Sequence, residues 1–327
     1  MVIAFAIFVS GCSATTQQGA NVSTGDPTPT IVTPEPKTVS LDDLDPELVR
    51  QIAFQEVKKA LLNSQTGTDQ VTHIFDKGIN RPLVDKAIAQ IPKMAGFFAD
   101  IAPVEQYTII WSVEGGSKNL QGLLCKEANY CEPRPPQDYC NMGELQYVVV
   151  FCASEPNEDY YLFPMFHAYG HIQQYAVAGV GHMPTWFGEG TASYFEGHFS
   201  GLYYSGPEYS TFGNGRSNLI RLLYDNQSIV KFEDPATQKN VIDALVASSN
   251  RIPEFGGWQE AQLGYYLGFV AVEALIATYG LEKFKDFWRT TKDEDFYEAF
   301  EKSFGISANK FYKKLAPYAV EMMQRDG

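Results

Sequence analysis

Two histidines four residues apart are the residues of this sequence with the clearest capacity for chemistry. They are His167 and His171, in the segment Phe-His-Ala-Tyr-Gly-His-Ile-Gln-Gln. On a helix, side chains four residues apart lie on one face, so both imidazoles could bind a single metal ion. Such pairs also occur on helix surfaces and in protein cores without a metal. A third ligand is therefore needed before a metal site is favoured.

Glu189 is the candidate third ligand, 18 residues after His171 in the segment Trp-Phe-Gly-Glu-Gly-Thr-Ala-Ser-Tyr-Phe. If the chain turns at 179–181, Glu189 on the next helix faces back toward the histidines. Two imidazoles and a carboxylate around an open fourth position are the ligand set of many catalytic zinc sites. The sequence thus predicts a zinc site of His167, His171 and Glu189. Ser193, one turn after Glu189, could hydrogen-bond a ligand imidazole, although helix packing is a simpler role.

At these residues the chain resembles the gluzincin family, the thermolysin-type (peptidase MA-like) zinc metallopeptidases. That family carries His-Glu-x-x-His, often with Gln three residues later, and Trp-x-x-Glu-Gly-x-Ala-x-Tyr on the next helix. Here Gln174 follows His171 by three residues, and residues 186–194 match the second motif at each defined position. The resemblance covers roughly residues 107–318 and is loose outside the two motifs. It implies a metallopeptidase-like fold and a zinc cofactor.

The first motif departs from the family at Ala168, which occupies the position of the glutamate. In the family that carboxylate takes a proton from the attacking water and passes it to the leaving amine. Alanine cannot exchange a proton, and Tyr169 points about 100° away on the helix. Loss of a positioned general base typically removes a factor of about 10² to 10⁴ in rate. The resemblance therefore implies an impaired enzyme, a pseudoenzyme that could bind a peptide or cell-envelope ligand.

Two other functions remain open from the sequence. The chain could be an active zinc peptidase in which a carboxylate from a distant loop supplies the base. It could also be a cell-envelope interaction protein that binds no metal. Other titratable residues have simpler interpretations: Glu196 as a solvent-exposed helix charge, His182 and His198 as surface residues, and His73 as a residue without a role.

The elements that must position the site follow from residue patterns. Apolar residues at helical spacing, caps and glycine or proline breaks predict helices, and runs of β-branched and aromatic residues predict strands. Helices are expected over 45–62, 82–100 with a break near Pro92, from 159 onward, 184–199, around 218–223, 264–279, and 296–322 with a break at Gly305. Strands are expected over 107–113 and 146–152. The prediction is an α+β fold: a small sheet packed on an active-site helix, followed by a mainly helical C-terminal half.

The N-terminal residues favour export. Residues 2–9 form an apolar run too short to cross a bilayer and are typical of the central part of a signal peptide. Val-Ser-Gly-Cys at 9–12 resembles a bacterial lipobox, which implies cleavage before Cys12, a lipid anchor on its thiol and an extracytoplasmic protein. A buried N-terminal strand is the alternative. The lack of a basic start leaves open a first residue upstream of Met1.

Residues 13–40 are rich in Ser, Thr, Gly, Gln and Pro, which predicts a disordered tether between the anchor and a body of residues 41–327. Four more cysteines, Cys125, Cys131, Cys140 and Cys152, lie close together in that body. In an exported chain such a set favours two disulfides, with three possible pairings. A zinc ribbon is disfavoured because none of the spacings is Cys-x-x-Cys.

The composition supports a folded, acidic protein. The chain has 327 residues, of which 45% are hydrophobic, enough for a full-sized core. Lys and Arg total 25 against 39 Asp and Glu, a formal net charge of -14. Because this surface repels phosphate, nucleic acid is a poor candidate partner.

Overall fold

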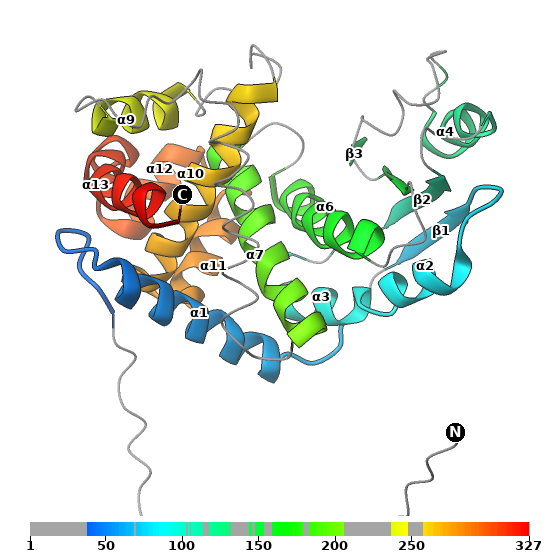
Figure 1. The fold of residues 1–327 in the computed structure, drawn as a ribbon, viewed down its shortest axis with the longest axis horizontal. Helices are drawn as coiled ribbons and strands as arrows, with labels where there is room; N and C mark the ends of the chain where they lie inside the picture. Colours follow the sequence, from blue (N-terminus) through cyan, green and yellow to red (C-terminus); the bar gives the residue numbers. More distant parts are fainter. Residues whose placement is uncertain are drawn as a thin grey trace, which may run out of the picture. The chain divides into compact units, whose positions relative to one another are not determined.

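The computed structural model of the protein describes residues 38–68, 70–102, 104, 106–113, 118–129, 131, 144–145, 148–153, 159–178, 183–205, 237–247 and 258–326. These residues form the α+β fold predicted from the sequence (Figure 1). Several predictions lie outside the described residues: the signal and lipobox at 1–12, residues 13–37 of the tether, the turn at 179–181, the helix around 218–223, and Cys140.

The sheet has four strands in the order β1-β2-β4-β3. β1 (Val71–Phe75), β2 (Tyr107–Val113) and β4 (Val148–Ala153) are parallel, and the short β3 (Glu144–Leu145) pairs antiparallel with β4. The central strand β2 is buried along most of its length, as expected for a parallel strand covered on both faces.

Two helices pack on this sheet. α4 (Leu120–Ala128) contributes Leu120 and Leu124 to a small apolar cluster with Ile110 of β2 and Val148 of β4. α6 (Asp159–Ala178) packs on β4, and its Tyr169 ring lies 6.2 Å from the ring of Tyr107 in β2. The prediction of a small sheet packed against the helix that carries His167 and His171 is therefore confirmed.

The N-terminal helices follow local signals. α1 (Pro46–Asn63) begins where the Asp45 carboxylate accepts a hydrogen bond from the Leu48 N–H at 2.8 Å. The expected break near Pro92 separates α2 (Arg81–Ile88) from α3 (Ile91–Phe98). Before α1, Val39 is 7% exposed and its N–H donates to the Ala277 carbonyl at 3.2 Å. Val39 thus belongs to the folded body and not to the tether, because its apolar side chain is buried in the core.

The described part of the C-terminal half is helical, as predicted. Its elements are α7 (Thr185–Ser205), α9 (Thr237–Ala247), α10 (Trp258–Tyr279), α11 (Leu281–Thr290), α12 (Phe296–Phe304) and α13 (Ala308–Asp326). The expected break at Gly305 is present: Gly305 ends α12 with φ of 69°, in the left-handed region that glycine adopts without strain. None of the described helices is both long and apolar enough to cross a membrane.

α7 lies between α6 and α10, and glycines allow both contacts to be close (Figure 1). A Cβ atom on Gly170 of α6 would lie 2.8 Å from the Cα of Ala192 in α7. On the other side, a Cβ on Gly190 would lie 2.2 Å from the carbonyl carbon of Gly268 in α10. Both distances are shorter than real Cβ contacts, so larger residues would force the helices apart. These contacts fix α6 and α7 relative to each other at the level of the site.

Candidate metal centre

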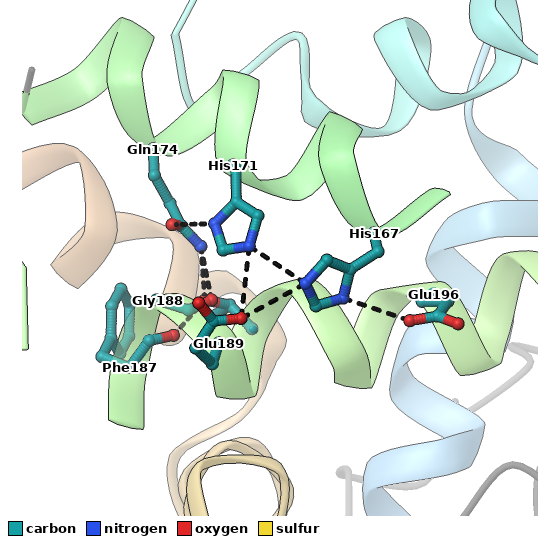
Figure 2. Close-up of polar contacts among 8 residues, drawn as sticks. His167, His171, Gln174, Phe187, Gly188, Glu189 and Glu196 are labelled. Carbon is teal, nitrogen blue, oxygen red and sulfur yellow. Dashed lines mark hydrogen bonds and ion pairs between the residues drawn. The ribbon is translucent and has the colours of Figure 1, made fainter. Parts of the chain in front are cut away.

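α6 and α7 bring the three predicted ligands together (Figure 2). His167 and His171 project from one face of α6, and Glu189 faces them from α7. The two Nε2 atoms are 3.0 Å apart, and Glu189 Oε2 lies 3.2 Å from Nε2 of His167 and 3.3 Å from Nε2 of His171. The three side chains are buried or nearly so, at 17%, 8% and 10% exposure respectively. They form a group that could hold a metal ion.

The triangle of ligand atoms has the size that a tetrahedral ion requires. With metal–ligand bonds of about 2.0 to 2.1 Å, two ligands of a tetrahedral site lie about 3.3 Å apart. The three measured edges, 3.0, 3.2 and 3.3 Å, are close to this value without any rearrangement. The donor set and the spacing therefore both fit a small divalent cation.

The second motif supplies the packing that orients Glu189. Trp186 is fully buried and donates its indole N–H to the hydroxyl of Tyr312 in α13 at 2.8 Å. Gly190 lies against Gly268, and Ala192 lies against Gly170. Tryptophan, glycine and alanine at these positions thus fix the rotation and the depth of α7, so that Glu189 points at the histidines.

The orientation of His171 is fixed by a chain of hydrogen bonds that ends on the backbone. The side-chain amide of Gln174 lies 2.8 Å from the Gly188 carbonyl oxygen. Because a carbonyl oxygen only accepts hydrogen bonds, the Gln174 atom in this contact is Nε2, which donates. Gln174 Oε1 must then face His171 and accept from its Nδ1–H at 3.0 Å. Thr191, which donates to the Phe187 carbonyl, also accepts from Gln174 Nε2 at 2.9 Å. This chain leaves His171 Nε2 as the nitrogen directed at Glu189.

His167 is held by a different group, the carboxylate of Glu196. Oε2 of Glu196 lies 3.1 Å from Nδ1 of His167 (Figure 2). The Glu196 side chain is 28% exposed. The interpretation of Glu196 as a solvent-exposed helix charge was therefore wrong. Glu189 and Glu196 are two helical turns apart and lie on one face of α7, so the spacing was a signal available in the sequence. What the sequence could not provide was the register between α6 and α7.

The imidazole partners are thus Gln174 and Glu196, and not Ser193. Ser193 is buried, and its hydroxyl makes no hydrogen bond within the part of the chain that the structure describes. Ala168, at the position of the family's glutamate, is 3% exposed and packs in the main hydrophobic core. The methyl group of Ala168 cannot exchange a proton with a ligand at the site.

Hydrogen bonds and charges shift the protonation of the centre. Burial alone would lower the pKa of His167, but its bonds to Glu189 and Glu196 and the charges of both carboxylates raise it to about 10. Burial alone would raise the pKa of Glu189, but the charge of His171 and the bonds to both imidazoles hold it well below its usual range. At neutral pH His167 therefore carries a proton that a bound metal ion must displace.

Two other histidines, His198 and His73, contact neighbouring aromatic residues. His198 is 3% exposed, with its ring stacked on Phe54 and at 4.8 Å from the ring of Tyr194, so its assignment to the surface was wrong. Burial lowers the pKa of His198 to about 3. His73, for which no partner was expected, accepts a hydrogen bond from the indole of Trp111 at 3.2 Å. His182 lies outside the described residues.

One disulfide is present in the described residues, between Cys125 and Cys131. It joins α4 to the segment that follows the helix. Of the three ways to pair the four cysteines, the one that contains this bond joins Cys140 to Cys152. Cys140 and the side chain of Cys152 lie outside the described part of the structure.

Comparison of the chain with protein family models, with curated proteins and with solved structures found no match. The gluzincin resemblance accordingly depends on the two motifs and remains a prediction.

Proposed function

We propose that this protein binds one zinc ion through His167, His171 and Glu189. The observation that carries the proposal is the buried triangle of ligand atoms with edges of 3.0 to 3.3 Å. Two imidazoles and one carboxylate are the protein ligands of thermolysin-like zinc sites, in which the fourth position stays open. Each imidazole has a hydrogen-bond partner on Nδ1, as ligands of zinc almost always do. When bound, the ion would act as a Lewis acid toward a carbonyl oxygen at the open position.

We further propose that the protein is a metallopeptidase-like pseudoenzyme, in which peptide hydrolysis is impaired. A zinc peptidase needs a carboxylate placed to move a proton from water to the leaving amine. Ala168 lacks that group, and the nearby Glu196 carboxylate contacts Nδ1 of His167, the ring nitrogen opposite the ligand atom. This geometry disfavours Glu196 as a replacement base. Binding of a peptide or another cell-envelope ligand is the function that such a site retains.

The proposed location is the outer face of a bacterial membrane. The lipobox-like sequence ending at Cys12 would provide the lipid anchor, and residues 13–37 would connect it to the folded body. The Cys125–Cys131 disulfide agrees with an exported protein, because such bonds persist in oxidising compartments. Metabolic labelling with a fatty-acid analogue tests the anchor: label should enter the wild type and be absent from Cys12→Ala.

The test of impaired hydrolysis compares Ala168→Glu with Ala168→Gln in the zinc-loaded protein. The two side chains have the same shape, but only glutamate can act as a base. We expect no measurable hydrolysis of unfolded casein by the wild type or Ala168→Gln. Ala168→Glu should recover part of the factor of about 10² to 10⁴ that a general base supplies. Recovery will be partial, because position 168 is buried and a longer side chain must displace its neighbours.

Two results would contradict this account. Strong peptidase activity of the wild type, abolished by a chelator, would show that another residue supplies the base. Equal inactivity of both variants, with zinc bound and thermal stability retained, would show that the resemblance to peptidases extends to the fold and the metal but not to the reaction.

A further inference from the structure

The two imidazoles of the centre are held by partners of opposite character. His171 is held by Gln174, a neutral side chain that is 5% exposed and tied to the Gly188 carbonyl. His167 is held by Glu196, a carboxylate whose side chain is 28% exposed. Neutral and charged partners both orient a ring, but only the charged partner changes the total charge of the site.

One face of α7 presents carboxylates to both nitrogens of the His167 ring. Glu189 approaches Nε2 at 3.2 Å, and Glu196, two helical turns further along, approaches Nδ1 at 3.1 Å (Figure 2). The ring therefore lies between two anions on the same helix. Rotation of the imidazole away from Glu189 would break the contact with Glu196 as well, so the second carboxylate preserves the position of the ligand atom.

The formal charges of these four residues indicate which kind of cation the site would hold. With both imidazoles neutral and both glutamates ionised, the four residues carry two negative charges, which equal the charge of one divalent cation. Without Glu196 the occupied site would keep a net positive charge in a largely buried position, which is costly. A site of this charge suits Zn²⁺ or another divalent ion better than a monovalent one.

We infer that Glu196 is a positioning residue of this centre: it holds the His167 ring with Nε2 toward Glu189 and supplies a second negative charge that balances a bound divalent cation. The inference rests on the proposed zinc site and adds to it a residue outside the matched motifs. The competing role for Glu196 is a plain helix-to-helix contact between α7 and α6, which would affect stability and not the metal.

The experiment measures zinc affinity by competition with a chromophoric chelator, in the wild type and three variants. Glu196→Gln keeps the shape and a hydrogen-bond acceptor but removes the charge, and Glu196→Ala removes both. Glu301→Gln, at an exposed position of α12, is the control for loss of one negative charge elsewhere. The visible absorption of the cobalt-substituted proteins reports the geometry around the ion, and thermal unfolding of the metal-free proteins reports stability.

We expect Glu301→Gln to bind zinc as the wild type does. Glu196→Gln should bind about tenfold more weakly and Glu196→Ala up to about a hundredfold more weakly, the range found for outer partners of metal ligands. The cobalt spectrum should change in both Glu196 variants. If Glu196→Ala does not fold, the matched Glu196→Gln variant still decides the question.

Two outcomes would overturn the inference, and they are distinguishable. Zinc binding by the wild type, with unchanged affinity and cobalt spectrum in Glu196→Gln, would reduce Glu196 to a helix contact while leaving the zinc site intact. Absence of zinc from the wild type would remove the proposed site, and this inference with it.

Discussion

Gly170 and Ala192 bring α6 and α7 into contact beside the three proposed metal ligands: a Cβ on Gly170 would lie 2.8 Å from the Ala192 Cα. Gly170 directly precedes His171, and Ala192 is three residues after Glu189. The closeness of the two helices at this point sets the distance between the imidazoles and the carboxylate. Both the fold and the site depend on the same small residues.

Gly170→Ala should therefore weaken both the stability of the fold and the binding of zinc. The added methyl must push α6 away from α7, so we expect a loss of about 1 to 3 kcal/mol in the free energy of unfolding. Zinc affinity should fall at least tenfold, because the ligand atoms move apart. Chemical denaturation of the metal-free protein and chelator competition measure the two effects.

Gly122→Ala is the matched control for this substitution. Gly122 lies in α4, and a Cβ there meets no atom within 4 Å. Since alanine is favoured over glycine in a helix, Gly122→Ala should raise stability by about 0.5 to 1 kcal/mol and leave zinc affinity unchanged. Unchanged stability and zinc binding in Gly170→Ala would show that the helices tolerate separation at this contact.

Zinc binding should release protons. The pKa of His167 is raised to about 10, so at pH 7 the ring is protonated, and a metal ligand must be neutral. Raising the pH removes this competing proton, so apparent affinity should increase about tenfold per pH unit up to the pKa. Calorimetry at pH 7 in buffers of different ionisation enthalpy should detect about one proton released. Affinity that is constant between pH 7 and 9 would contradict the assignment.

Acid should destabilise the protein through His198. Burial lowers the pKa of His198 to about 3, against 6.5 as the ordinary value. Below pH 6.5 the unfolded chain therefore binds a proton that the folded chain does not, and the free energy of unfolding falls as pH falls. Between pH 6.5 and 3 the contribution of this residue is about 1.4 kcal/mol per pH unit.

His198→Phe tests this contribution, because phenylalanine retains the stacking on Phe54 and cannot be protonated. The metal-free variant should lose less stability than the wild type between pH 6.5 and 4, by at least about 2 kcal/mol. Denaturation curves with chelator present provide the comparison. The same pH dependence in both proteins would show that His198 is protonated in the folded state.

The remaining cysteines should be paired. With Cys125 bonded to Cys131, we expect a second disulfide between Cys140 and Cys152. Together with a lipid on Cys12, this leaves no free thiol in the unreduced mature protein. Thiol labelling after denaturation, followed by peptide mass spectrometry, measures this. A label on Cys140 or Cys152 would contradict the second bond, and a label on Cys12 would contradict the anchor.

Local sequence signals were sufficient to predict many of the helices and strands. β2 has the bounds expected from its run of β-branched and aromatic residues, and the break at Gly305 is where glycine predicted it. β1 was missed because its five residues include the polar Thr72 and His73 and it is an edge strand. α11 was not predicted, although Leu281, Phe284 and Phe287 give it an apolar face at helical spacing, which is a local signal for a helix.

For the site, the sequence predicted the three residues that the structure brings together but not all their partners. His167 and His171 were candidates because their spacing is local, and Glu189 because it lies in a recognisable motif. Glu196 pairs with a residue 29 positions away, and this contact depends on how α6 and α7 are packed. Only the structure supplies that register, through the glycine contacts on both faces of α7.

The central claim is that His167, His171 and Glu189 bind one zinc ion, and the metal content of the purified protein tests it most directly. The protein should be prepared without chelators, and zinc, iron, manganese, nickel and copper should be measured together. We predict about one zinc per chain in the wild type and a large loss of zinc in His171→Ala, which retains only two protein ligands. Glu301→Gln should keep the full content. Wild-type protein without a bound metal, or with zinc that His171→Ala retains in full, would contradict the account.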